Sequence, residues 1–103
     1  MRMLFEWDPT KAASNLRKHR VSFDIAVRVF ADPWALTLQD RTEGGEQRWQ
    51  TIGLVDGYCL LLVAHTVYED DSDGQPVEII RIILARKADR KERQRYEQET
   101  RSA

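Results

Sequence analysis

The stretch EQRWQTIGLVDGYCLLLVAHTVYE, residues Glu46–Glu69, predicts two antiparallel strands joined by a tight turn. Apolar runs flank Asp56-Gly57, a dipeptide that favours a two-residue hairpin turn because both of its positions tolerate positive φ. A lone hairpin is marginally stable and needs further strands or a helix against its apolar face. The segments on either side therefore decide what kind of sheet it joins.

The N-terminal side supplies a strand, two helices and another strand. MLFEW (residues 3–7) predicts a short strand, and Asp8 can cap a helix over Pro9–His19 that has proline at its tolerated first position. A second helix is predicted within Ser22–Pro33, where serine caps the start, apolar residues recur at helical spacing and proline ends it. WALTLQD (residues 34–40) returns to a strand pattern.

The C-terminal side adds one more strand and a last helix. The acidic turn DDSDGQP leads into VEIIRIILAR (residues 77–86), and Asp89 with Glu92 matches a capping box for a helix over Asp89–Glu99. This order predicts an α+β fold in which an N-terminal strand and two helices pack on an antiparallel meander sheet, with a charged C-terminal helix. We expect a single domain over residues 1–103.

Composition restricts the classes of function. The chain has 103 residues and a formal net charge of -1, which excludes a globally basic nucleic-acid binder and leaves only a local patch for a polyanion. No apolar run could cross a bilayer, and the first residues are too quickly polar for a signal peptide, so we expect a cytoplasmic protein without membrane contact. Cys59 is the only cysteine and no Cys or His pair has ligand spacing, so we expect no metal and no cofactor.

Arg81 interrupts the most apolar strand. Strict alternation puts Arg81 on the same face as Ile79 and Ile83, whereas Arg86 falls on the opposite face with Leu84. Contact of both arginines with one phosphate would therefore require a twist or a bulge between them. A shielded guanidinium costs several kcal/mol unless it meets a carboxylate, water or an anion.

Two interpretations of Arg81 follow. In the first, Arg81 pairs with Glu46, Glu78 or another acid across the sheet. In the second, it belongs to an anion site on an open sheet face. Arg48, which shares one face of a neighbouring strand with Gln50, favours the second, because two arginines and a nearby hydroxyl could clamp a phosphate.

The last helix and each of the two histidines also allow two interpretations. Charge pairs around Arg93 at i,i+4 spacing fit a solvated helix, but Tyr96 is its only large apolar side chain, so a protein or RNA partner is the other interpretation. His65 alternates with apolar residues and favours a core histidine over a catalytic one. His19 ends a helix beside Lys18, where capping through the helix dipole and a functional role are both open.

Together these segments resemble the BrnT family, the toxins of bacterial BrnT/BrnA type II toxin-antitoxin pairs. The resemblance extends from Phe5 to Tyr96. It is carried by FEWDPTKAASNLRKH (Phe5–His19), SFDIAVRVFADP (Ser22–Pro33), EQRWQTIG (Glu46–Gly53) and IRIILARKADRKERQRYE (Ile80–Glu97). Two residues depart from the family pattern: Arg20 stands where a glycine is usual, which suggests a different turn between the helices. Leu84 replaces a usual serine and removes a hydroxyl.

The resemblance implies a RelE-like fold and a ribonuclease that inhibits translation. It also implies a small BrnA-like ribbon-helix-helix antitoxin, with two toxins and two antitoxins in the complex, whereas the free toxin is a monomer or a dimer. The family parallel makes Arg48, Arg81, Arg86, Tyr96 and His19 the catalytic candidates. Lys11, Lys18, Lys87 and Arg90 are the candidates for binding RNA around them.

Metal-independent cleavage of RNA requires three tasks: removal of a proton from the 2′-OH, stabilisation of negative charge around phosphorus, and protonation of the departing 5′ oxygen. The arginine fork suits the second task, so we assign it to Arg81 and Arg48 with Arg86 in support. Tyr96 would need a cationic neighbourhood, supplied by Arg86 and Arg93, to act as a base. His19 is its rival as acid or base.

Two other functions are open. A binding module would use the charged helix and the arginine-bearing strand to dock a protein or a nucleic acid without catalysis, and salt-sensitive binding without cleavage would favour it. A small-molecule enzyme is the third class. The sequence contains no glycine-rich phosphate loop and no nucleophile elbow to support it.

Overall fold

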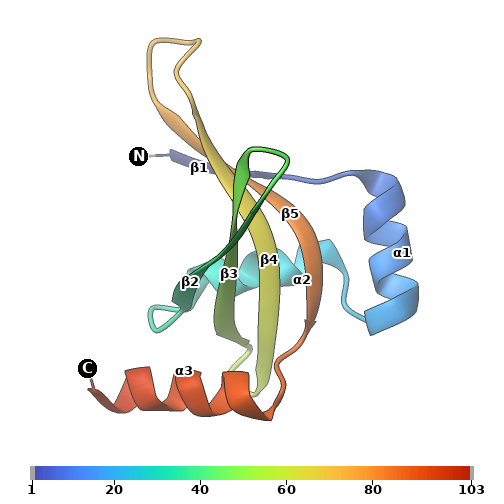
Figure 1. Ribbon diagram of the computed structural model, residues 1–103, viewed down its shortest axis with the longest axis vertical. Coiled ribbons are helices and arrows are strands. Elements are labelled where there is room, and N and C mark those ends of the chain that lie inside the picture. Colours follow the sequence, from blue (N-terminus) through green and yellow to red (C-terminus); the bar gives the residue numbers. More distant parts are fainter. Residues whose placement is uncertain (1, 103) are drawn as a thin grey trace.

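A five-stranded sheet forms the centre of the molecule (Figure 1). The computed structural model describes residues 2–102. The strands, in spatial order, are β1 (Arg2–Glu6), β5 (Val77–Lys87), β4 (Cys59–Asp70), β3 (Glu46–Val55) and β2 (Leu36–Glu43). Strands β2 to β5 form the predicted antiparallel meander. Strand β1 pairs in parallel with β5, a pairing that the sequence pattern did not predict.

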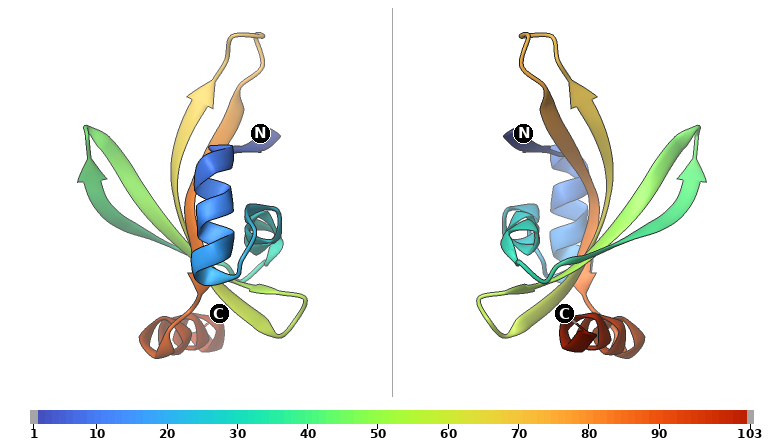
Figure 2. Two further views of the ribbon diagram at one scale, coloured as in Figure 1. Left: turned by 90° about the vertical axis from the view of Figure 1, so that its right-hand side faces the viewer. Right: turned by 90° about the vertical axis from the view of Figure 1, so that its left-hand side faces the viewer.

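The helices lie on both sides of this sheet (Figure 2). Helix α1 (Pro9–His19), the short α2 (Phe23–Ala26) and the 3₁₀ turn η1 (Val27–Ala31) cover one face. Helix α3 (Arg90–Ser102) crosses the lower end of the other face. The predicted α+β fold is therefore confirmed, with α1 at its predicted bounds.

The predicted caps set where the helices begin. The carboxylate of Asp8 accepts a hydrogen bond from the Thr10 N–H at 2.9 Å, and the hydroxyl of Ser22 accepts one from the Ile25 N–H at 3.1 Å. These bonds satisfy N–H groups that the first helical turn leaves unpaired. Helix α3 extends past its predicted end at Glu99.

Arg20 closes α1 in the left-handed conformation, with φ 62°. Its N–H donates to the Leu16 carbonyl at 3.0 Å, which is the usual pattern of a helix end closed by glycine. The expectation of a different turn at this position is therefore wrong. The arginine adopts the backbone conformation that a glycine would adopt, at a steric cost of ~1 kcal/mol.

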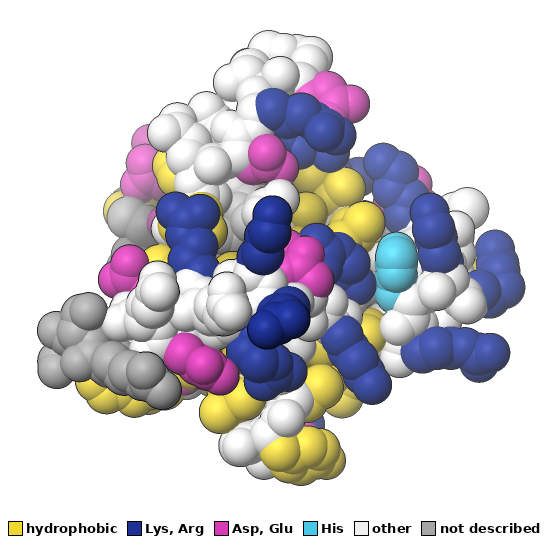
Figure 3. Space-filling model, turned by 60° about the horizontal axis from the view of Figure 1, so that its bottom comes forward, with side chains coloured by type: hydrophobic (Ala, Val, Ile, Leu, Met, Phe, Trp, Pro, Cys, Tyr) yellow, Lys and Arg dark blue, Asp and Glu magenta, His cyan; other side chains and the backbone are white. Residues whose placement is uncertain are grey.

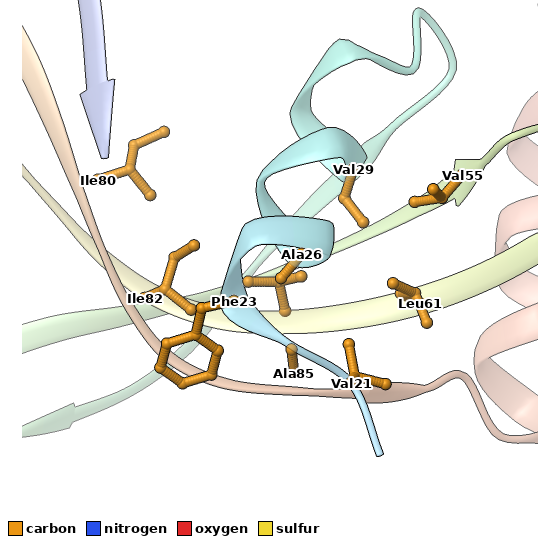
Figure 4. Close-up of a cluster of buried hydrophobic side chains, with 10 residues drawn as sticks. Val21, Phe23, Ala26, Val29, Val55, Leu61, Ile80, Ile82 and Ala85 are labelled. Carbon is orange, nitrogen blue, oxygen red and sulfur yellow. The ribbon is translucent and has the colours of Figure 1, made fainter. Parts of the chain in front are cut away.

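The main core lies between the sheet and the helices α1 and α2 (Figure 4). It consists of buried side chains from the helical segment and from three strands: Val21, Phe23, Ala26, Val29, Val55, Leu61, Val63, Ile80, Ile82 and Ala85. The backbone of η1 comes so close to β3 that a Cβ at Gly53 would lie 2.8 Å from the Val29 carbonyl oxygen. Only glycine fits this contact.

A smaller core lies under α3 on the opposite face. Tyr96 packs there against Ile52, Leu60 and Leu62, with Leu84 at its edge. The single large apolar side chain of α3 is thus 8% exposed and fixes the helix to the sheet. This contact accounts for a helix that otherwise has no apolar stripe.

The side chain of Asn15 replaces a missing strand. Strand β1 pairs with β5 only as far as Arg81, so the lower half of β5 has a free edge. The Asn15 amide donates to the Ala85 carbonyl at 2.8 Å, and its oxygen accepts from the Ala85 N–H at 3.2 Å. It also donates to the Val21 carbonyl at 2.9 Å, which joins α1, the next turn and the sheet.

Strand β5 contains a bulge that changes the predicted faces. His65 of β4 pairs with Ile82 and the preceding Ala64 pairs with Leu84, so Ile83 is an extra residue. A bulge residue shifts the alternation of everything after it. Arg86 therefore lies on the same face as Arg81, and the prediction that they lie on opposite faces is wrong.

The β3–β4 hairpin forms where it was predicted, with a longer loop. Asp56 and Gly57 have φ of 57° and 79°, the left-handed values expected of this turn. The ladder closes one residue later, at the pair of Val55 and Cys59, so Tyr58 also belongs to the loop. As a result the Tyr58 side chain projects from the end of the hairpin and is 80% exposed.

Candidate functional site

One face of the sheet is uncovered above α3, and we call this surface the open face (Figure 2). Three of its side chains come from three neighbouring strands. Thr66 of β4 pairs with Arg81 of β5. Arg48 precedes Trp49, the β3 partner of His65, so alternation puts it on the same face as Thr66.

Two donors in this row have no acceptor. The Nε of Arg48 and the hydroxyl of Thr66 are shielded from water, and neither has a hydrogen-bond partner within the described part of the chain. The nearest carboxylate to Arg48 is that of Glu43, at 3.9 Å. Shielded polar groups nearly always have a partner, so this arrangement suits an anion that supplies the missing acceptor.

Arg81 is paired with Glu6, the residue beside it on β1. The distance from the guanidinium to the carboxylate is 2.9 Å, and the second Glu6 oxygen accepts from the Tyr68 hydroxyl at 2.9 Å. The hydrogen bond to Glu6 raises the pKa of Tyr68. An ion pair for Arg81 was one of the two expectations, but the partner is neither Glu46 nor Glu78.

This ion pair does not preclude an anion site. The side chains of Arg81 and Glu6 are 44% and 37% exposed, and exposed pairs contribute only ~0–1 kcal/mol. A phosphate that approaches the open face can therefore compete for the guanidinium at little cost.

Arg86 lies lower on the same face and contacts a different carboxylate. Two of its nitrogens donate to the two oxygens of Glu92, each at 2.8 Å, and this bond raises the pKa of Arg86. Arg86 and Arg81 pair with Leu62 and Thr66 of β4, which are ~13 Å apart at 3.3 Å per residue. The two arginines are therefore spaced to contact different phosphates.

The Tyr96 hydroxyl points to a carboxylate, not to the expected cations. It donates to Asp32 at 2.7 Å, and burial together with this bond raises the pKa of Tyr96 to about 12. Burial tends to raise the pKa of Asp32, but hydrogen bonds from Leu54, Tyr96 and Trp34 together lower it. Within residues 2–102, the Tyr96 hydroxyl thus binds an anion, and Arg86, which was expected to supply a cation to it, pairs with Glu92.

His65 is a buried core residue, as its alternation predicted. It is 2% exposed, its Nε2 lies 2.8 Å from the Thr51 hydroxyl, and its ring packs edge-on to Phe30 at 5.1 Å. Burial lowers the pKa of His65 to about 4, although a backbone contact at Thr66 opposes the shift. The imidazole is therefore neutral near pH 7.

Four of the remaining predicted residues gather at the lower end of the molecule. We call this surface the basic end: it comprises the last turn of α1, the end of β5 and the first turns of α3. Figure 3 views this end and shows that Lys and Arg predominate there around a histidine. It contains Lys18, His19, Lys87 and Arg90.

His19 does not converge with the arginines of the open face. It ends α1, which covers the opposite face of the sheet, and Lys11 lies at the far end of the same helix. Apart from Lys11, the predicted residues thus form two groups. The first comprises Arg48, Arg81, Arg86 and Tyr96 on one face. The second surrounds the basic end.

The two ends of the molecule carry opposite charge. Between residues 69 and 78, at the turn from β4 to β5, the chain has five acidic residues and no basic one. We call this turn the acidic tip, and it lies at the opposite end of the sheet from α3 (Figure 1). The net charge of -1 conceals this separation.

Within residues 2–102, no three His, Cys, Asp or Glu side chains are grouped so that they could hold a metal ion. None of the helices in this range is both long and apolar enough to traverse a bilayer.

Comparison with known proteins assigns the family. The family model described as "Ribonuclease toxin, BrnT, of type II toxin-antitoxin system" matches residues 7–92. The chain belongs to the BrnT family. The crystal structure of the Brucella abortus ribonuclease toxin BrnT aligns with it at a TM-score of 0.58 and 21% identity, over 87% of this chain and 100% of that one. This likeness shows that the BrnT fold is shared. No curated protein sequence matches the chain.

Three side chains on the open face of this BrnT-family protein were not among the site residues predicted from the sequence. Glu6 reaches Arg81 only because β1 pairs in parallel with β5, and no local pattern specifies that pairing. Thr66 and Tyr68 alternate with His65 and Val67, so their face could have been predicted. Their position beside Arg81 depends on the register between β4 and β5.

Proposed function

We propose that this BrnT-family protein is a metal-independent endoribonuclease that cleaves RNA on the open face. The unpartnered Arg48 Nε and Thr66 hydroxyl beside Arg81 support this most directly, because they offer donors to a phosphate where no helix covers the sheet. An uncovered row of such donors, in a family of ribonuclease toxins, suits the scissile phosphate of a single strand.

Arg48 and Arg81 stabilise the negative charge that develops around phosphorus. A guanidinium group is planar and presents parallel donors to phosphate oxygens. The Thr66 hydroxyl, shielded between them, donates a further bond to the same phosphate. Once the phosphate has displaced Glu6 from Arg81, these donors hold the charge that develops around phosphorus.

Glu6 and Tyr68 transfer the protons. The Glu6 carboxylate already accepts hydrogen bonds beside Arg81, and when phosphate takes over the guanidinium it is free to accept the 2′-OH proton. The Tyr68 hydroxyl, 2.9 Å from Glu6, supplies the proton for the departing 5′ oxygen. His19 is the rival for proton transfer, from the opposite side of the sheet.

The other candidates hold the flanking RNA or the fold. Arg86 contacts a phosphate further along the strand, and Lys18, Lys87 and Arg90 attract the backbone at the basic end. Lys11 lies apart and adds a weaker, long-range attraction. Tyr96 positions α3 through Asp32 and takes no proton, because its pKa of about 12 leaves it protonated at neutral pH.

The test is cleavage of a single-stranded RNA by the purified protein in excess EDTA. Arg81→Ala and Glu6→Gln should each lower the rate by ~10²–10³-fold, the usual cost of one oriented transition-state group. Arg2→Ala is the matched control, because Arg2 is exposed and lies beside the acidic tip, away from the proposed centre. Full activity of both site variants would exclude the proposed centre.

Two further variants separate the alternatives. Tyr96→Phe should retain cleavage if α3 stays docked. Loss of cleavage in a folded Tyr96→Phe protein would show that the Tyr96 hydroxyl takes part in the reaction. His19→Gln tests the rival in the same way. Salt-sensitive RNA binding by the wild type without any cleavage would favour the binding module instead.

We also propose that a BrnA-like ribbon-helix-helix antitoxin neutralises the protein in a 2:2 complex. Membership of a type II toxin family supports an antitoxin partner in general. Co-expression with such a protein, followed by light scattering on the purified complex, measures the stoichiometry. A mass that corresponds to a 1:1 complex would contradict the proposal.

A further inference from the structure

The β3–β4 loop presents an aromatic side chain to solvent at the basic end. Tyr58 is 80% exposed, more than any other large hydrophobic side chain that the structure describes. The left-handed φ values of Asp56 and Gly57 fix the loop, and Asp56 forms an ion pair with Arg28 of η1. The loop backbone therefore directs the Tyr58 side chain outward into solvent.

Beside Tyr58 is a cavity of about 250 Å³ with an apolar floor and a cationic rim. It is lined by Tyr58, Cys59, Leu60, Lys87, Ala88 and Arg93. The Ala88 N–H donates to the Leu60 carbonyl at 3.0 Å, which ties the start of α3 to the end of β4. The floor is thus part of the rigid sheet.

The two cations at the rim have no carboxylate partner among the described residues. Lys87 and Arg93 form no ion pair there, although Arg93 stands four residues from Asp89 and from Glu97. A free ammonium and a free guanidinium beside an unstacked ring are the combination by which proteins hold single-stranded nucleic acid. The ring stacks on a base, and the cations hold the backbone.

We propose that this cavity binds one base of a single-stranded RNA, stacked on Tyr58, with an adjacent phosphate held by Lys87 and Arg93. The inference rests on the proposed ribonuclease function and adds a binding site to it. The cavity is smaller than the 300–1,000 Å³ typical of drug-sized ligands, which suits a single base. An acidic peptide could satisfy the cations but would leave the face of the ring unused.

The site lies at a fixed distance from the open face. Leu60 lines the cavity and Thr66 pairs with Arg81 on the same strand, so the two places are ~20 Å apart at 3.3 Å per residue. Arg86 pairs with Leu62 between them. An RNA strand that runs along β5 would contact the cavity, Arg86 and the open face. Stacking on Tyr58 would therefore select where along the RNA the cut falls.

The experiment measures binding of a fluorescent 2′-O-methyl oligonucleotide, which cannot be cleaved by attack of the 2′ oxygen, by anisotropy. Tyr58→Ala should weaken binding about 5- to 140-fold, as expected for one stacked base. Tyr58→Phe keeps the ring and should bind within about two-fold of the wild type. Trp34→Ala removes another exposed aromatic, 49% exposed and not among the residues that line the cavity, and should have no effect.

Two further measurements identify the chemistry of the site. Lys87→Gln should reduce the slope of log affinity against log salt by about 1. A matched oligonucleotide with abasic sugars should bind the wild type and Tyr58→Ala equally, because there is no base to stack. Since Tyr58 is exposed, the variant should fold like the wild type, which circular dichroism checks.

The outcomes separate this inference from the function on which it rests. If the wild type cleaves RNA and Tyr58→Ala binds as tightly as the wild type, the base site is refuted and the ribonuclease stands. Equal loss of affinity for the abasic probe would refute stacking. Binding of a fluorescent poly-glutamate peptide by the wild type but not by Lys87→Gln, with no binding of RNA to the wild type, would assign the cavity to an acidic protein segment and refute both proposals.

Discussion

Replacing Asn15 tests whether one side chain holds the free edge of the sheet. Asn15→Ala leaves the N–H and the carbonyl of Ala85, and the carbonyl of Val21, without partners. Ala85 is completely buried, and a shielded polar group without a partner costs at least ~1 kcal/mol. The three groups together predict a loss of ~3 kcal/mol, a large part of the ~5–15 kcal/mol of a domain of this size.

Urea unfolding followed by tryptophan fluorescence measures this loss. At an m value of ~1–3 kcal/mol per molar urea, the midpoint should fall by ~1–3 M. Ser14→Ala is the matched control, because it changes the exposed neighbour in the same helix and should shift stability by less than ~0.5 kcal/mol. A loss below ~1 kcal/mol in Asn15→Ala would show that the amide is not the partner of the sheet edge.

Three more outcomes follow from the structure. Between about pH 6.5 and 4, His65 should be protonated in the unfolded chain but neutral in the folded protein, where it is buried. The free energy of unfolding should therefore decrease by up to ~3 kcal/mol as the pH is lowered through this range, as urea titrations measure, and His65→Gln should lose this dependence. Gly53→Ala should lower stability by ~1–3 kcal/mol in thermal unfolding, because its Cβ would collide with the Val29 carbonyl; an unchanged melting temperature would contradict the packing. Arg20→Gly should raise stability by ~0.5–1 kcal/mol, since the position is left-handed, and a decrease would show that the arginine makes a compensating contact.

Local chemistry predicted where the helices start, and it predicted the meander, but the single helix expected within Ser22–Pro33 divides into the short α2 and the 3₁₀ turn η1. Asp8, Ser22 and the Asp89–Glu92 capping box each specify a helix start within a few residues, and the structure contains all three caps. The parallel pairing of β1 with β5 was not predictable in the same way. It joins segments more than 70 residues apart, and its register depends on packing.

The candidate site shows where reasoning from alternation fails. The prediction for Arg81 held for the first half of β5, but the bulge at Ile83 reversed the alternation before Arg86. Nothing in IIRIIL marks which isoleucine is the extra residue. The partner of Tyr96 was also hidden, because Asp32 is 64 residues away and approaches only through the turn after η1.

The separation of charge between the acidic tip and the basic end gives the molecule a large electric dipole despite a net charge of -1. Such a protein turns in the field of a polyanion before contact, so that an RNA strand meets the basic end first. The same dipole favours head-to-tail attraction between copies at low ionic strength, which added salt should weaken because it screens charges that are further apart than the Debye length. The protein should therefore be retained by both kinds of ion exchanger: an anion exchanger should bind the acidic tip, and a cation exchanger should bind the basic end.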